Sequence, residues 1–81
     1  MKKTYHAKGT CTHQIDIDIE DGVVRSVQFY GGCSGNQQGI SMLVAGMDAR
    51  KARDILNGIK CGRKNTSCPD QLARAIEMAL A

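Results

Sequence analysis

The sequence predicts an α+β domain in which an antiparallel β-hairpin, or a three-stranded sheet, packs against three helices. Two segments with the two-residue apolar period of strands come first, on either side of a Glu-Asp-Gly turn. Three segments with the helical spacing of three to four residues follow. The 81 residues contain no linker, repeat or low-complexity stretch, so we expect a single domain over residues 1–81.

The hairpin is the clearest β prediction. Residues 13–20 alternate strictly between polar and apolar, as does most of segment 23–30. The apolar positions are Ile15, Ile17 and Ile19 in the first segment and Val23, Val27 and Phe29 in the second. The acidic residues of the first segment lie on its other face, where we expect solvent. Residues 4–9 predict a short additional edge strand.

The register of the hairpin bears on two cysteines. Opposed residues share a sheet face, so the two apolar sets meet only across a loop with an odd number of residues. A three-residue loop over residues 20–22, with Gly22 in the left-handed region, satisfies this condition. Cys11 then pairs with Gly31 and has Cys33 as a diagonal neighbour, whereas a shift by two residues puts Cys11 opposite Cys33. In both registers the two thiols reach the open end of the hairpin on its apolar face.

Three helices follow the glycine-rich loop. The first is expected from about residue 37 to residue 46 or 47, the second begins after the capping residue Asp48, and the third follows a capping box over residues 67–70. Their apolar stripes are, in order, Ile40, Leu43, Val44 and Met47; Ala52, Ile55, Leu56 and Ile59; and Leu72, Ala75, Ile76, Ala79 and Leu80.

Composition and charge exclude several function classes. The net charge of +3 is mild and its basic residues are scattered, which does not favour nucleic-acid binding. No apolar run is long enough to span a bilayer, and the first residues carry no secretory signal, so we expect a cytoplasmic protein with reduced thiols. The glycine-rich loop lacks the lysine and following Ser or Thr of a phosphate loop, so nucleotide binding is not expected there.

The four cysteines are the candidate functional residues. Cys11, Cys33, Cys61 and Cys68 each lie where a predicted element begins or ends, which suits a tetrahedral metal site better than a core. One phenylalanine, two tyrosines and no tryptophan make a small core, which a structural metal would supplement. We therefore expect Cys11, Cys33, Cys61 and Cys68 to bind one zinc ion. Cys68 falls in the first turn of the last helix, where the helix dipole stabilises a thiolate.

Other uses of the thiols remain open. An iron–sulfur cluster is the alternative cofactor, and His13 or Asp70 are further candidate ligands. A thiol redox protein that donates electrons to a reductase would use Cys61 and Cys68, although six residues separate them where dithiol carriers have two. No catalytic triad is recognisable, and no carboxylate pair outside the exposed acidic strand, so we do not expect the chain to be catalytic alone.

Three blocks of the chain resemble the TSCPD domain family. They are Gly9-Thr10-Cys11, the segment Gly31-Gly32-Cys33-Ser34-Gly35-Asn36, and Thr66-Ser67-Cys68-Pro69-Asp70, which carries the family signature. Similar domains occur near the C-terminus of adenosylcobalamin-dependent ribonucleotide reductases. The resemblance therefore implies a partner of that class and a link to ribonucleoside-diphosphate reductase activity. The chain itself is too short for the barrel, radical cofactor and nucleotide pocket of a reductase.

The order of elements also resembles the U-type iron–sulfur assembly scaffolds. Cys11, Cys33 and Cys68 fall where that family has its three cluster cysteines. Ser67 stands where those scaffolds usually have histidine, and Thr12-His13 replaces the Gly-Asp that follows their first cysteine. The resemblance implies a scaffold-like fold, and Cys61 would supply a fourth thiolate.

Overall fold

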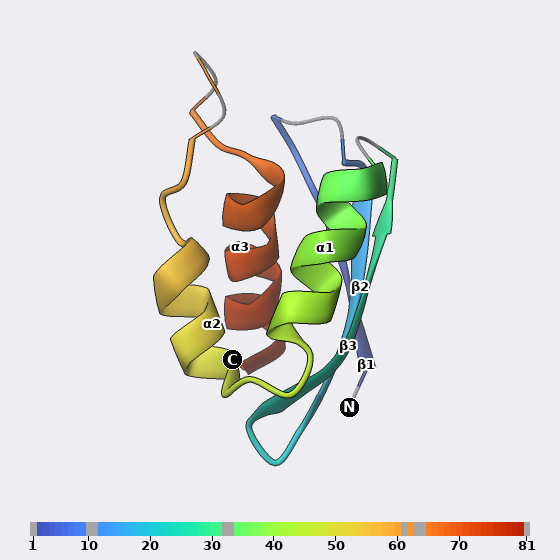
Figure 1. Cartoon of the computed structure of the whole chain (residues 1–81), viewed down its shortest axis with the longest axis vertical. Helices are drawn as coiled ribbons and strands as arrows, with labels where there is room; N and C mark the ends of the chain where they lie inside the picture. Colours follow the sequence, from blue (N-terminus) through green and yellow to red (C-terminus); the bar gives the residue numbers. More distant parts are fainter. Residues whose placement is uncertain (1, 10–11, 32–33, 61, 63–64, 81) are drawn as a thin grey trace.

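The α+β fold predicted from the sequence is confirmed in a computed structural model, which describes residues 2–9, 12–31, 34–60, 62 and 65–80 (Figure 1). Three antiparallel strands form a sheet in the order β1-β2-β3, and three helices follow them. The elements are β1 (Lys2–His6), β2 (Gln14–Glu20), β3 (Val23–Tyr30), α1 (Ser34–Val44), α2 (Ala49–Leu56) and α3 (Cys68–Leu80). The expected edge strand is therefore present as β1. No helix within the described ranges is long and apolar enough to cross a membrane.

The helices cover one face of the sheet in two layers. Helix α3 lies against β1 and β2, α1 lies against β3, and α2 packs on α3 away from the sheet (Figure 1). The core therefore lies between the middle strand and α3. It contains the three isoleucines of β2, each at most 3% exposed, together with Leu72 and Ile76 of α3, which are fully buried. The predicted apolar faces of β2 and α3 are thus confirmed.

The predicted three-residue hairpin loop is wrong. Asp21 and Gly22 alone form the turn, with φ angles of 53° and 76°, as in the two-residue turns whose twist matches that of the strands. With a two-residue loop alone, the apolar residues of β2 and β3 would lie on opposite faces of the sheet. A bulge brings them to the same face, because the register shifts by one residue between Asp18 and Ile19. Beyond the bulge, Ile17 pairs with Val27, which is the register shifted by two residues from the one that the longer loop gives.

The bulge also changes which residue of β3 enters the core. Val24 is fully buried, whereas Val23, the residue expected in the core, is only half-buried. The extra residue on β3 turns Val24 to the helix-covered face, and Phe29 reaches the same face further along. Strict alternation in the sequence could not show this change of face.

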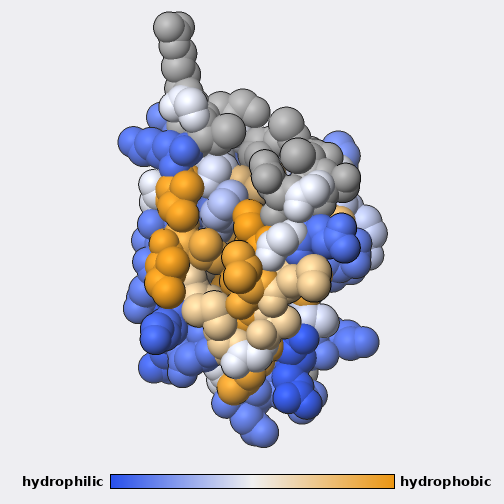
Figure 2. Space-filling model, in the orientation of Figure 1, coloured by the Kyte–Doolittle hydropathy of each residue, from blue (hydrophilic) through white to orange (hydrophobic). Residues whose placement is uncertain are grey.

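The helix boundaries and stripes differ from the predictions in several places. Helix α1 begins three residues earlier than expected and ends at Val44, before Gly46, whose φ is 89°. Asp48 caps α2 as predicted, because its carboxylate accepts a hydrogen bond from the Lys51 amide at 3.1 Å. The predicted stripes of α1 and α2 are too wide, since Leu43, Ile55 and Ile59 are 76%, 56% and 41% exposed. Figure 2, in the same orientation as Figure 1, shows that apolar residues gather over the helices on the side of the molecule turned toward the reader.

Candidate functional site

The N-terminus of α3 is held in place by a network of side-chain hydrogen bonds. The Ser67 hydroxyl accepts a hydrogen bond from the Asp70 amide at 3.1 Å and donates one to the Ile59 carbonyl at 2.6 Å. Ser67 is therefore the helix cap, as the capping box predicted, and it also anchors the segment that follows α2. Cys68 is the first residue of the helix, where unpaired amides and the helix dipole favour a thiolate.

The sulfur of Cys68 is half-buried and meets two polar side chains from other parts of the chain. The Thr12 hydroxyl oxygen lies 2.9 Å from Cys68 Sγ, and Gln37 Nε2 lies 3.7 Å from it. Thr12 precedes β2 and is 1% exposed, while Gln37 belongs to the first turn of α1 and is 5% exposed. Residues that are 56 and 31 positions away in the sequence thus meet at the start of α3.

Gln37 also bonds two other groups beside the sulfur. Its amide nitrogen donates hydrogen bonds to the Thr12 hydroxyl oxygen at 2.7 Å and to the Gly31 carbonyl at 2.5 Å. In the contact between Thr12 and Cys68 either atom can be the donor, because a hydroxyl both donates and accepts. A thiolate sulfur can only accept, so in that form of Cys68 the Thr12 hydroxyl is the donor.

A second buried network lies behind the sulfur and is structural. Asp70 is 1% exposed and accepts hydrogen bonds from the Gly58 amide at 2.8 Å, from the Thr66 hydroxyl and from Arg74 Nε at 3.3 Å. Burial alone would raise the pKa of Asp70, but the hydrogen bonds from Thr66 and Gly58, with the charge of Arg74, lower the pKa below its ordinary value. This carboxylate therefore ties α3 to the end of α2. Its contacts with protein donors account for its burial without a metal ion.

The turn at Gly9 is tied to the same network. Gln71 accepts a hydrogen bond from the Lys8 amide at 3.0 Å and donates one to the Thr66 hydroxyl at 2.9 Å. Gly9 has a φ of 80°, and a Cβ added to it would lie 2.9 Å from the Thr66 methyl group. The position therefore requires glycine on two grounds, its backbone angle and its close contact.

The acidic face of β2 is a separate, solvent-facing cluster. Asp16 accepts hydrogen bonds from the Thr4 hydroxyl at 2.8 Å, Gln14 Nε2 at 3.0 Å and the Tyr30 hydroxyl at 3.2 Å. The Thr4 hydrogen bond, followed by the one from Gln14, lowers the pKa of Asp16, and hydrogen bonding to Asp16 raises the pKa of Tyr30. These contacts join all three strands on the face away from the helices.

Of the predicted metal ligands, only Cys68 lies in the part of the chain that the structure describes. Cys11, Cys33 and Cys61 lie outside the described residues. Among the described side chains, no group of three His, Cys, Asp or Glu residues could hold a metal ion. His13, considered as a further ligand, is exposed. The sequence analysis missed Thr12 and Gln37 as partners of the sulfur; the one available signal was that Thr12 directly follows a cysteine.

A comparison with protein families identifies the chain. The model of the TSCPD domain matches residues 1–80. The chain belongs to the TSCPD domain family. No curated protein and no solved structure matches it significantly. In this TSCPD domain, Thr66, Ser67 and Asp70 of the signature have structural roles, as partner of Asp70, helix cap and buried anchor. The signature cysteine differs from them because its sulfur faces residues of two other segments.

Proposed function

We propose that this TSCPD domain is a cysteine-ligated metal-binding module in which Cys11, Cys33, Cys61 and Cys68 bind one zinc ion. The observation that carries the proposal is the meeting of three segments at the Cys68 sulfur. Thr12 directly follows Cys11, and α1, which supplies Gln37, begins directly after Cys33. The described residues that meet Cys68 thus stand one and four residues after two of the other cysteines in the sequence.

The surroundings of Cys68 fit a metal-bound thiolate. A thiolate is the form of cysteine that binds metals, and it is stabilised by the helix N-terminus and by donors such as the Thr12 hydroxyl. Donors of this kind orient the ligand and offset its charge. Bound zinc would join the hairpin end to the helices and contribute to folding, as in closed four-thiolate sites.

The segment that follows α2 also returns to the start of α3. Ser67 in turn holds the Ile59 carbonyl beside the start of α3, and Ile59 is two residues before Cys61. Described residues close in sequence to the other three cysteines, namely Thr12, Gln37 and Ile59, therefore lie beside the start of α3.

An accessory role beside ribonucleotide reductase in the cytoplasm rests on the family resemblance alone. In that role the module would bind another protein and would not itself catalyse the reduction. An iron–sulfur cluster in the same site is the alternative cofactor, because thiolates bind both.

Metal analysis of untagged protein purified without air tests the proposal. We expect about one zinc per chain, full retention in His13→Ala, since that residue is exposed, and loss in Cys33→Ser and Cys68→Ser. Cys61→Ser should retain more metal, because Cys61 lies in a basic loop segment of the sequence. A metal content near zero with four titratable thiols would refute a metal site, and visible absorbance with bound iron would replace zinc by a cluster.

A further inference from the structure

One edge of the sheet is only partly covered. Strand β3 pairs with β2 on one side, and the start of its other side is covered by residues 46–48. There the Val24 amide donates to the Met47 carbonyl at 2.9 Å, and the Gly46 amide donates to the Val24 carbonyl at 2.7 Å. From Ser26 to Tyr30 the described part of the chain places no strand along this edge.

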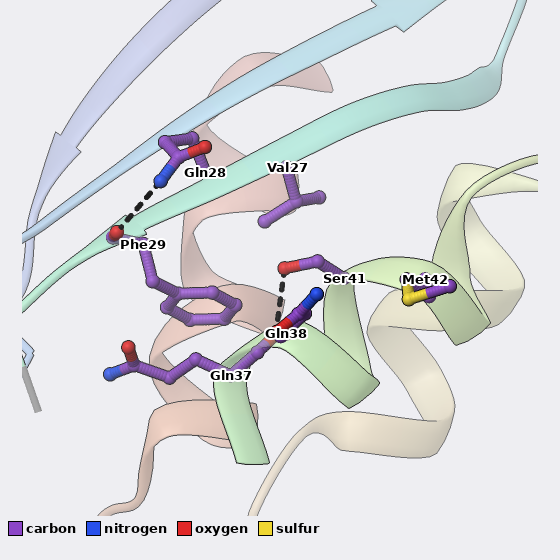
Figure 3. A pocket seen from close by; sticks show the side chains of 7 residues that line it. All are labelled: Val27, Gln28, Phe29, Gln37, Gln38, Ser41 and Met42. Atoms are coloured by element: carbon purple, nitrogen blue, oxygen red, sulfur yellow. Dashed lines mark hydrogen bonds between the residues drawn. The ribbon is translucent and has the colours of Figure 1, made fainter. Parts of the chain in front are cut away.

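The backbone groups that face outward follow from the strand geometry. The Tyr30 carbonyl accepts a hydrogen bond from the His13 amide at 2.9 Å, so it points toward β2. Backbone groups alternate in direction along a strand, so those of Val27 and Phe29 point away from β2. In agreement, the Phe29 carbonyl accepts a hydrogen bond from the Gln28 side chain, at 3.2 Å from Nε2 (Figure 3).

A groove runs along this edge between β3 and α1. It has a volume of about 340 Å³, and Figure 3 shows its lining side chains, which are Val27, Gln28, Phe29, Gln37, Gln38, Ser41 and Met42. None of the lining residues is charged. Met42, from α1, is 72% exposed. The edge is therefore a row of backbone donors and acceptors beside an uncharged groove, a combination that accepts an added strand.

We propose that the β3 edge pairs with the β3 edge of a second copy of this chain, antiparallel about a two-fold axis at Gln28, to give a continuous sheet of both copies. Val27 then exchanges backbone hydrogen bonds with Phe29 of the second copy, which matches the outward direction of both residues. The Gln28 side chain leaves its own strand's carbonyl and bonds Gln28 of the second copy.

The β3 sequence favours a second copy as the occupant. The two-fold axis places Gln28 opposite the Gln28 of the second copy, so a charged residue at this position would repel its equivalent. The segment from Ser26 to Tyr30 contains no charge, and it pairs a β-branched residue with an aromatic one across the axis. The opposite edge differs, because β1 begins with Lys2 and Lys3, and lysines disfavour edge pairing. The second copy would also cover Met42.

Two surface variants of α1 provide a matched test. Met42→Glu adds a charge beside the β3 edge, whereas Leu43→Glu adds the same charge at the next residue, which is equally exposed but does not line the groove. Sedimentation equilibrium up to about 1 mM chain detects association as weak as a Kd of about 1 mM. A reductant in the buffer excludes intermolecular disulfides. We expect twice the 8.8 kDa chain mass for the unchanged protein and for Leu43→Glu, and a Kd raised at least about tenfold by Met42→Glu.

Amide hydrogen exchange locates the interface independently. The Val27 and Phe29 amides should become protected as the concentration of the chain rises, while amides of β1 remain unchanged. A protein that stays monomeric to 1 mM overturns the proposal. So does a dimer that survives Met42→Glu, a dimer that Leu43→Glu breaks, or concentration-dependent protection at β1 instead of β3.

Discussion

Replacing Asp70 tests whether the buried network at the start of α3 supports the fold. The carboxylate is 1% exposed and accepts hydrogen bonds from the Gly58 amide, the Thr66 hydroxyl and Arg74. Asp70→Ala removes the acceptor for all three donors. The Thr66 hydroxyl is buried and is left with an unused proton, whereas the Gly58 amide lies in an exposed residue that water can reach.

The expected cost follows from these surroundings. A hydrogen bond to a charged group contributes about 1.5–3 kcal/mol, and a buried unsatisfied donor costs about 1–3 kcal/mol. Water compensates part of the loss at Gly58, and the pair with the half-exposed Arg74 contributes little. We therefore expect Asp70→Ala to lower the free energy of unfolding by about 2–4 kcal/mol. For a domain of this size that is a fall in Tm of about 10–30 °C.

Urea unfolding followed by circular dichroism measures the change. The matched control is Asp54→Ala in α2, since the Asp54 side chain is 70% exposed and pairs with the adjacent Arg53, so its loss should cost within about 0.5 kcal/mol. Asp70→Asn, which keeps one acceptor oxygen, should fall between the two. If Asp70→Ala were as stable as Asp54→Ala, the network would contribute nothing and the reasoning would be refuted.

Three further predictions follow from other contacts. Thr12→Val removes the hydroxyl beside the α3 sulfur and should weaken metal binding about 10- to 100-fold in a chelator competition, whereas the exposed Thr4→Val should not. The pKa of Asp16 is lowered in the folded state, so the Asp16 carboxylate stabilises the fold above about pH 4, and this stabilisation is lost as the pH falls through the folded-state pKa. In acid unfolding, the stability advantage of the unchanged protein over Asp16→Asn should therefore disappear at low pH. A stability difference that stays constant with pH would contradict this prediction. Leu72→Ala should lower the free energy of unfolding by about 2–5 kcal/mol, because Leu72 is fully buried. Ile55→Ala should change the free energy of unfolding by no more than about 0.5 kcal/mol, because Ile55 is 56% exposed, and equal effects of the two substitutions would contradict this prediction.

The sequence was sufficient for the elements whose residues meet the core in a regular pattern. The isoleucines of β2 alternate because that strand is covered on one face only, and the stripe of α3 is complete because the helix lies directly on the sheet. Asp48 was recognisable because capping is a local contact, here with Lys51. Each of these features can be recognised from one short segment of the sequence.

The errors arose where a tertiary contact overrides local periodicity. The bulge at Asp18 and Ile19 brings Val24 into the core, and no residue in the segment signals it. The stripe of α2 was drawn too wide because α2 packs mainly on α3, with Ala49 and Ala52 fully buried there and Ile55 left exposed. Apolar spacing indicates which residues can be buried, but the neighbouring elements decide how many are.

The candidate site shows why a signature alone cannot separate structure from function. In the segment from Thr66 to Asp70, the threonine, the serine and the aspartate are each accounted for by a bond that holds α3 to the end of α2. The sulfur of Cys68 is met by Thr12 and Gln37, from the two segments that follow other cysteines in the chain. Cys68 also packs against the core, so its contacts with Thr12 and Gln37 can serve stability, metal binding or both. The proposed metal site predicts that variants of Thr12 and Gln37 change metal affinity more than they change stability.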